Sequence, residues 1–316
     1  MASTTIVTIV LLAVIQAAMC ATNNCSRTCY PSEFFPAIKG NLTKIVWAHA
    51  VNSQAELEKA LLSDDVMMLE ADVVMGKLNN STDIIPIMAH PPTTESDLSL
   101  EDFLNISNNG SKGIKLDFKS NEAFENSKPI LIKLRPTLKR PVFLNADILP
   151  GPVNATTVPL NATEFLKGAN ETMPDSILSI GWTTRYGKEH NITKGRYNTE
   201  QLKKMVDIVA ENRVSQPVTY PVRAGLAAND IDGVKALLKN TTSTNATLTI
   251  WSSEGDFVDA AQLSKLIREV GVDKVYVDVP NDLRSKLNFS GASAMIPAMM
   301  INLGAALALL AMTRML

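Results

Sequence analysis

Short apolar runs recur through the middle of this chain and alternate with longer stretches whose apolar residues are three or four positions apart. The short runs are typical of buried strands and the longer stretches of amphipathic helices. Eight strands are expected, at residues 45–48, 67–73, 113–118, 142–146, 177–182, 218–223, 247–251 and 274–279. Five helices are expected between them, at 54–62 after Ser53, 100–105 after Ser99, 200–213 opened by Thr199, 231–238 after Asp230 and 257–270 after Asp256.

Alternating strands and helices of this length predict an α/β fold, a parallel (β/α)8 barrel of the TIM type. The barrel is expected to occupy residues 41–283, and segment 74–111 is interpreted as an enlarged loop with a short strand before His90. Barrels of this kind place their active sites at the C-terminal ends of the strands. Polar residues at those ends are therefore the candidates for function.

The second and third strands carry acidic residues inside apolar runs. Glu70 and Asp72 are two residues apart and point to the same side, as do Asp117 and Lys119 on the next strand. Buried carboxylates repel each other, and a hard divalent cation such as Mg²⁺ or Ca²⁺ would relieve that repulsion. We expect the three acids to hold one such ion and Lys119 to bind a phosphate oxygen.

Two histidines follow apolar strands, His49 after residues 45–48 and His90 after residues 84–89. Histidine exchanges protons near neutral pH, so both are candidate catalytic residues. A single histidine at a strand end is more often a hydrogen-bonded structural residue. The joint pattern of acids, histidines and a lysine on successive strands is what favours a metal-dependent phosphodiesterase site.

Later strands end in further polar or aromatic residues. Asn145, Arg223 and Trp251 are candidate phosphate-binding or substrate-binding residues. The alternative is that the polar ones hold loops together and that the tryptophan belongs to the core. Weaker candidates at the same ends are Asp147, Trp182, Arg185, Glu254 and Asp278.

The order and spacing of these residues resemble the PLC-like phosphodiesterase superfamily, which includes glycerophosphodiester phosphodiesterases and spider-venom sphingomyelinase D enzymes. The resemblance implies that Glu70, Asp72 and Asp117 bind the metal, that His49 and His90 serve as acid and base, and that Lys119 contacts phosphate. One departure is that Ala50 and Val51 follow His49, where the glycerophosphodiesterase subgroup has His-Arg-Gly. A phosphate-binding arginine is missing there.

A closer resemblance, over about residues 40–280, is to the menorin family. The motifs that carry it are residues 47–53, 68–73, 86–92, 112–120, 144–149, 181–184 and 220–224. Membership implies an extracellular protein with a phosphodiesterase-like barrel. Some members act in neuronal dendrite patterning as cell-surface ligands, so the resemblance implies the fold more strongly than it implies catalysis.

The two ends of the chain predict an extracellular location. Residues 1–20 contain an apolar run of signal-peptide length, and 21–40 form an N-terminal extension. Residues 284–316 contain small residues around Ser290 and then an apolar tail, which favours a GPI-attachment signal at Ser290. The alternative is a single-pass membrane anchor, because residues 294–312 could just span a bilayer.

Many Asn-x-Ser/Thr sequons support the same location, because glycosylation of these sites occurs in the secretory pathway. They begin at Asn24, Asn41, Asn79, Asn80, Asn105, Asn109, Asn154, Asn161, Asn170, Asn191, Asn240, Asn245 and Asn288. Cys20 would leave with the signal peptide, so Cys25 and Cys29 are expected to pair in a disulfide. The formal net charge of −2 gives no indication of nucleic-acid binding.

The sequence thus predicts metal-assisted cleavage of a phosphodiester, either a lipid headgroup or a soluble glycerophosphodiester. The competing hypothesis is a glycosylated cell-surface ligand that uses the barrel as a recognition scaffold for protein partners. A fold cannot separate the two by itself, because one fold serves many functions.

Overall fold

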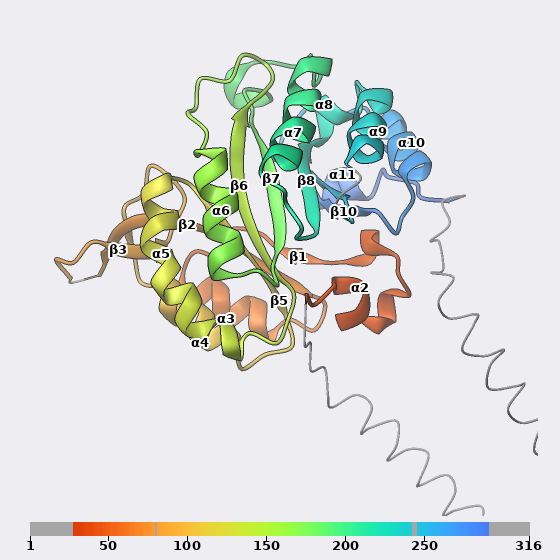
Figure 1. Cartoon of the computed structure of the whole chain (residues 1–316). Helices are drawn as coiled ribbons and strands as arrows, with labels where there is room; N and C mark the ends of the chain where they lie inside the picture. The colour runs from red at the N-terminus through yellow and green to blue at the C-terminus, as the bar shows by residue number, and fades with distance from the viewer. Residues whose placement is uncertain (1–27, 80, 242–244, 291–316) are drawn as a thin grey trace, which may run out of the picture.

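A computed structural model describes residues 28–79, 81–241 and 245–290 of the chain. Eight parallel strands form a nearly closed barrel with helices around it, as Figure 1 shows, and the predicted TIM-barrel fold is confirmed. The strands, in their order around the barrel, are β1 (Trp47–Ala48), β2 (Met68–Leu78), β5 (Gly113–Phe118), β6 (Val142–Pro150), β7 (Ile177–Thr183), β8 (Val218–Arg223), β9 (Thr247–Trp251) and β10 (Val275–Asp278).

Two further strands pair with the long β2 beyond the barrel. Strand β3 (Ile85–Met88) runs antiparallel to it and β4 (Glu95–Ser96) runs parallel. The short strand predicted before His90 is therefore confirmed, and Figure 1 shows this hairpin projecting from the side of the barrel. Its backbone brings Ala89 back to the barrel, because the Ala89 N–H donates to the Asp72 carbonyl over 3.1 Å.

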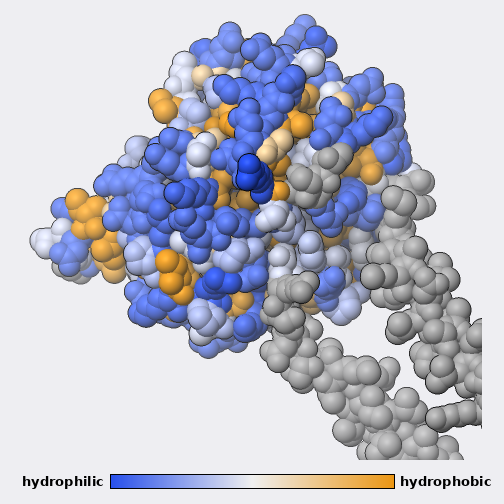
Figure 2. All heavy atoms as spheres, viewed as in Figure 1, coloured by the Kyte–Doolittle hydropathy of each residue, from blue (hydrophilic) through white to orange (hydrophobic). Residues whose placement is uncertain are grey.

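Most of the outer layer consists of seven helices. They are α3 (Gln54–Leu62), α4 (Leu100–Ser107), α5 (Asn121–Leu134), α6 (Ala162–Thr172), α7 (Thr199–Glu211), α9 (Ile231–Asn240) and α10 (Ala260–Val270). Shorter helical turns are α2 (Pro31–Phe34), η1 (Pro36–Ile38), η2 (Leu42–Lys44), η3 (Arg135–Thr137), η4 (Lys188–His190), α8 (Ala224–Ala227) and α11 (Asn281–Arg284). The face drawn in Figure 2 is mainly hydrophilic, with hydrophobic side chains in small groups.

The predicted helix starts were right where the expected side chain caps the backbone and wrong by one to three residues elsewhere. Ser53 and Ser99 accept from the backbone N–H three residues on, as predicted for N-caps. Helix α7 already includes Thr199, and its cap is Asn198, with which Gln201 completes a capping box. Helix α10 starts at Ala260 rather than at residue 257, because Asp259 caps it.

The N-terminal end of the barrel interior is filled by apolar side chains. Met68, Phe143, Ile177 and Tyr276 from four strands pack with Ile38, Leu42 and Ile45 of the preceding segment. The Trp47 ring joins them, at 5.8 Å from the ring of Phe143 and 6.1 Å from that of Tyr276. The interior is thus closed at this end, and its polar side chains gather at the other.

Several sequence expectations fall outside the described residues. They are the signal peptide, Asn24, Cys25, Asn80 and the apolar tail at 294–312. Cys29 is disulfide-bonded, and its expected pairing with Cys25 stays a prediction. In the described part of the chain, no helix has both the length and the apolar character needed to cross a membrane.

Candidate functional site

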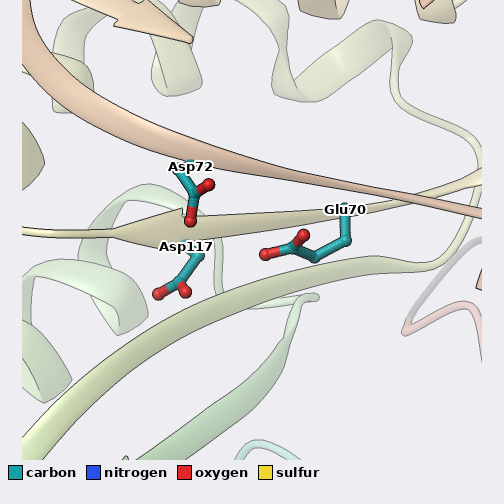
Figure 3. A group of neighbouring side chains, drawn as sticks. All are labelled: Glu70, Asp72 and Asp117. Carbon is teal, nitrogen blue, oxygen red and sulfur yellow. The ribbon is translucent and has the colours of Figure 1, made fainter. Parts of the chain in front are cut away.

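Three carboxylates converge at the C-terminal end of the barrel. Asp72 on β2 lies opposite Asp117 on β5, and Glu70 precedes Asp72 by two residues on the same face. One oxygen of each side chain lies within 4.8 Å of an oxygen of the others, and Figure 3 shows the three groups facing a common space. The predicted acidic cluster therefore exists as a group that could hold a metal ion.

Fixed donors orient two of these carboxylates. The Ala50 N–H donates to Glu70 Oε2 over 2.8 Å, and Ala50 adopts a left-handed backbone conformation with φ of 54°. The Asn52 amide donates to Asp72 Oδ2 over 2.8 Å and accepts from the Asp72 N–H over 2.9 Å. Because an ionised carboxylate has about four lone-pair directions, both groups keep acceptor capacity for a cation.

Asp117 is held from both sides. The Asn145 amide donates to Asp117 Oδ1 over 2.6 Å, and Asn145 in turn accepts from the Ser179 hydroxyl over 2.5 Å. The Lys119 ammonium lies 2.6 Å from Asp117 Oδ2 and 2.8 Å from Asp72 Oδ1. Both predicted residues, Asn145 and Lys119, therefore contact the acidic cluster directly.

Burial and neighbouring charges oppose each other in this cluster. Burial raises the pKa of Glu70, and His49 acts against that rise. Burial also acts to raise the pKa of Asp117, but Lys119 and Lys115 outweigh it and hold the pKa below its ordinary value. Burial and the charge of Asp117 raise the pKa of Asp147 to about 7.

His49 reaches the cluster from the end of β1. Its Nδ1 lies 3.3 Å from Glu70 Oε2 and 3.2 Å from Asp278 Oδ2, while 62% of its side chain stays exposed. The charge of Glu70 and a hydrogen bond with Asp278 raise the pKa of His49 to about 9 against the effect of burial. The ring is thus held by Nδ1, and Nε2 makes no hydrogen bond with any residue that the structure describes.

His90 is placed differently. It is exposed, and its Nδ1 lies 2.7 Å from the Pro91 carbonyl oxygen. The N–H of its neighbour Ala89 donates to the Asp72 carbonyl, so the His90 backbone lies at the same end of the barrel as the acidic cluster. Within the described residues, its ring forms no hydrogen bond or ion pair with the three carboxylates.

Arg223 and Trp251 lie together on the opposite side of the barrel. The Arg223 guanidinium forms two hydrogen bonds with Asp256, over 2.8 and 2.9 Å, and both side chains are almost fully buried. It also lies between the rings of Tyr186 and Trp251, at 5.6 and 5.0 Å from their centroids. A phosphate that bound Arg223, as one prediction had it, would therefore have to displace Asp256 from a buried ion pair. This arrangement fits the alternative prediction, in which Arg223 holds loops together.

The sequence reasoning missed Lys115, Asn52 and Asp256 as parts of this end of the barrel. Lys115 precedes Asp117 by two residues, so the same alternation that selected Asp117 and Lys119 could have found it. Asn52 and Asp256 lie in loops, where no periodic pattern shows which way a side chain points.

Most of the sequon asparagines are accessible. Those at Asn79, Asn105, Asn109, Asn154, Asn161, Asn170, Asn191, Asn240, Asn245 and Asn288 are exposed. Asn41 is half-buried and uses its Oδ1 to accept from the buried Thr43. Exposure permits glycosylation at the exposed sequon asparagines, but their glycosylation stays a prediction. Attachment of a lipid at Ser290 also stays a prediction.

Two comparisons with known proteins cover most of the barrel. The model of the Menorin N-terminal domain matches residues 41–284. Human protein FAM151B is 39% identical over 236 residues, which cover 75% of this chain and 82% of the human protein. The region matched by the family model contains every residue of the acidic cluster and His49.

Proposed function

This chain belongs to the menorin family, and on that premise we propose that its barrel mouth is the active site of a metal-dependent phosphodiesterase. The barrel would be of the PLC-like phosphodiesterase type, and its substrate a glycerophosphodiester or a phospholipid headgroup. The observation that supports this most is the meeting of Glu70, Asp72 and Asp117 within 4.8 Å. His49 and Lys119 lie beside them.

The three carboxylates fit one Mg²⁺ or Ca²⁺ ion, because both prefer carboxylate oxygens as ligands. Glu70 and Asp72 are 1% and 3% exposed, and buried carboxylates this close together are costly without a cation. When bound, such an ion polarises a phosphate and neutralises the charge that develops on it. Lys119 holds Asp72 and Asp117 in place through its two short contacts.

In this proposal one of the two histidines, His49 and His90, is the general acid, and the other is the base or the nucleophile. Glu70 and Asp278 fix the His49 ring through Nδ1, which leaves Nε2 on the other side of the ring to exchange a proton with the substrate. The His90 ring is held by fewer contacts, since only the Pro91 carbonyl engages it among the described residues. It would join the reaction once the substrate is bound.

We also propose that the barrel works outside the cell, at the outer face of the plasma membrane. The support is the signal-like run at the N-terminus, the exposed sequon asparagines, and the apolar tail after Ser290. A GPI anchor would hold the barrel near lipid headgroups. A single-pass anchor would do the same.

The test is a hydrolysis screen of glycerophosphodiesters and phospholipids with added Mg²⁺ or Ca²⁺. His49→Asn keeps a polar side chain but removes the titratable ring, so we expect the rate to fall by about 10² to 10⁴. Asp72→Asn should instead raise the metal concentration needed for half-maximal rate, because the site loses one charge. His190→Asn is the matched control, because His190 pairs with Glu189 and forms no hydrogen bond or ion pair with the cluster in the described structure.

The alternative is a cell-surface ligand that binds protein partners without turnover. The position of His90 favours it, because of the two histidine rings only that of His49 lies within ion-pair distance of the cluster in the described structure. Full cell-surface function of His49→Asn and Asp72→Asn at matched surface abundance would contradict the enzymatic proposal. Surface mutations would then be the ones that matter.

A further inference from the structure

Lys115 lies at the bottom of the polar half of the barrel. It is on β5 opposite Glu70 and two residues before Asp117, so its side chain shares the inner face with the acidic cluster. Only 5% of its surface is exposed. Its Nζ lies 5.7 Å from the centroid of the Trp47 ring, which belongs to the apolar floor of the barrel.

The Lys115 ammonium has no hydrogen bond and no ion pair within the described residues. Lys119, in contrast, forms ion pairs through its Nζ with Asp72 Oδ1 and Asp117 Oδ2, at 2.8 and 2.6 Å. An ammonium has three donors. The fully buried polar atoms that lack a partner do not include Lys115 Nζ, so this ammonium reaches accessible space at the base of the site.

The charge of Lys115 acts on several groups around the mouth. Its positive charge opposes the rise that burial causes in the pKa of Glu70 and Asp147, and it helps to hold the pKa of Asp117 and Asp278 below the ordinary value. It does so from a distance, since no oxygen of these groups forms an ion pair with it in the described structure. Its donors thus remain available to a group that enters the space above it.

Charge balance indicates what that group is. Lys119 and a bound divalent cation together neutralise the three carboxylates of the cluster, and His49 pairs with Asp278. Lys115 is then a positive charge without a paired carboxylate at the base of the site, offset only in part by Asp147, whose pKa burial raises to about 7. A phosphate group held by the cation would bring the matching negative charge, and an ammonium binds phosphate oxygens well as a point charge.

We propose that Lys115 is a phosphate-contacting residue, donating to an anionic oxygen of a phosphate group held at Glu70, Asp72 and Asp117. Lys119, to which the sequence pattern assigned this role, instead holds Asp72 and Asp117 in position. The inference rests on the proposed phosphodiesterase function and names a substrate contact within that site.

The test measures binding rather than activity. Mn²⁺ binding to the purified protein is followed by titration calorimetry with and without inorganic phosphate, corrected for Mn²⁺–phosphate complexes in solution. In the unmodified protein, phosphate should tighten Mn²⁺ binding about 5-fold or more, as expected for two coupled ligands. Lys115→Met should bind Mn²⁺ at least as tightly, because a nearby positive charge is gone, but its coupling factor should fall clearly below that of the unmodified protein, since phosphate then keeps only its contact with the metal.

Two other variants make the result specific. Lys133→Met removes an exposed lysine that pairs with Glu101 on the helix layer, and it should keep the full coupling. Lys119→Met should weaken or distort Mn²⁺ binding itself. Thermal melts followed by circular dichroism check folding, and Lys115→Gln replaces Lys115→Met if the latter does not fold.

Coupling of undiminished size in Lys115→Met, or a loss of coupling only in Lys119→Met, overturns the assignment of Lys115. Mn²⁺ binding that phosphate does not affect in the unmodified protein also overturns it, while the metal site of the proposed function survives. Absence of any Mn²⁺ binding in the unmodified protein would contradict the proposed metal site, and the proposed phosphate contact of Lys115 would be contradicted as well.

Discussion

The protonation of His49 depends on two carboxylates from distant parts of the chain. Glu70 on β2 and Asp278 at the end of β10 both lie within 3.3 Å of its Nδ1. Their negative charge favours the protonated ring and raises its pKa to about 9 in the metal-free protein. The contact with Asp278 also joins the first and last strands of the barrel, as does the packing of the Trp47 ring against that of Tyr276.

The metal-free protein should therefore show a pH-dependent stability. His49 has a higher pKa in the folded state than the ordinary 6.5, so its contribution is complete below pH 6.5 and is lost as the pH rises towards about 9. Urea unfolding at several pH values measures this. Glu70→Gln should lower the His49 pKa in an NMR titration, and the exposed Glu171→Gln should leave it unchanged; equal pKa values in both variants would contradict the stated cause.

The residues of the acidic cluster were predictable because strand alternation fixes their side. Glu70, Asp72 and Asp117 needed only a correct strand assignment to be placed on one inner face. The partners of the Lys115 and Lys119 ammonium groups could not be predicted in this way. Both lie on that face, and only the distances show that Lys119 is paired with carboxylates and Lys115 is not.

The loops after β7, β8 and β9 are joined by one buried ion pair. Arg223, the last residue of β8, binds Asp256 in the loop before α10 and reaches Thr184 after β7 over 3.2 Å. Gly187 lies so close that an added Cβ would come within 2.9 Å of the guanidinium. The far side of the barrel mouth is therefore organised around Arg223.

Breaking this pair should destabilise the protein strongly. Asp256→Ala leaves a buried guanidinium without its partner, and we expect a loss of about 3 to 5 kcal/mol in the free energy of unfolding. The matched control is Asp175→Ala, whose pair with Arg135 is about half exposed and should contribute about 0 to 1 kcal/mol. Urea denaturation of both variants measures the difference, and a loss in Asp256→Ala no greater than in the control would show that Arg223 finds other partners.

The strands were easier to predict than the helices. Apolar runs identified all eight barrel strands, including β5, β8 and β9 with their observed bounds. Helices α5 and α6 were not predicted, because Pro129 and Gly168 interrupt their helical patterns. Gly168 lies against the Phe124 ring, where a Cβ would come within 2.7 Å, so the two unpredicted helices pack closely together.

The whole molecule carries a formal charge of −2, so its attraction for cations comes from the local cluster rather than from its overall charge. The cluster also connects distant parts of the fold. Its hydrogen bonds reach the loop after β1 through Ala50 and Asn52, and β6 through Asn145. A cation bound by the three carboxylates would therefore stabilise the folded barrel as a whole, because the unfolded chain does not bring them together.

Mg²⁺ or Ca²⁺ should accordingly raise the melting temperature. At a free concentration about 100 times the dissociation constant, binding adds about 2.7 kcal/mol, which corresponds to roughly 5 to 10 °C for a domain of this size. Differential scanning calorimetry with each ion, and reversal by EDTA, measures the shift. Asp117→Asn removes one ligand charge and should lose most of it, whereas Asp175→Asn, an exposed acid paired with Arg135, should retain it. An equal shift in both variants would mean that the ion binds elsewhere on the barrel, because only Asp117 belongs to the cluster.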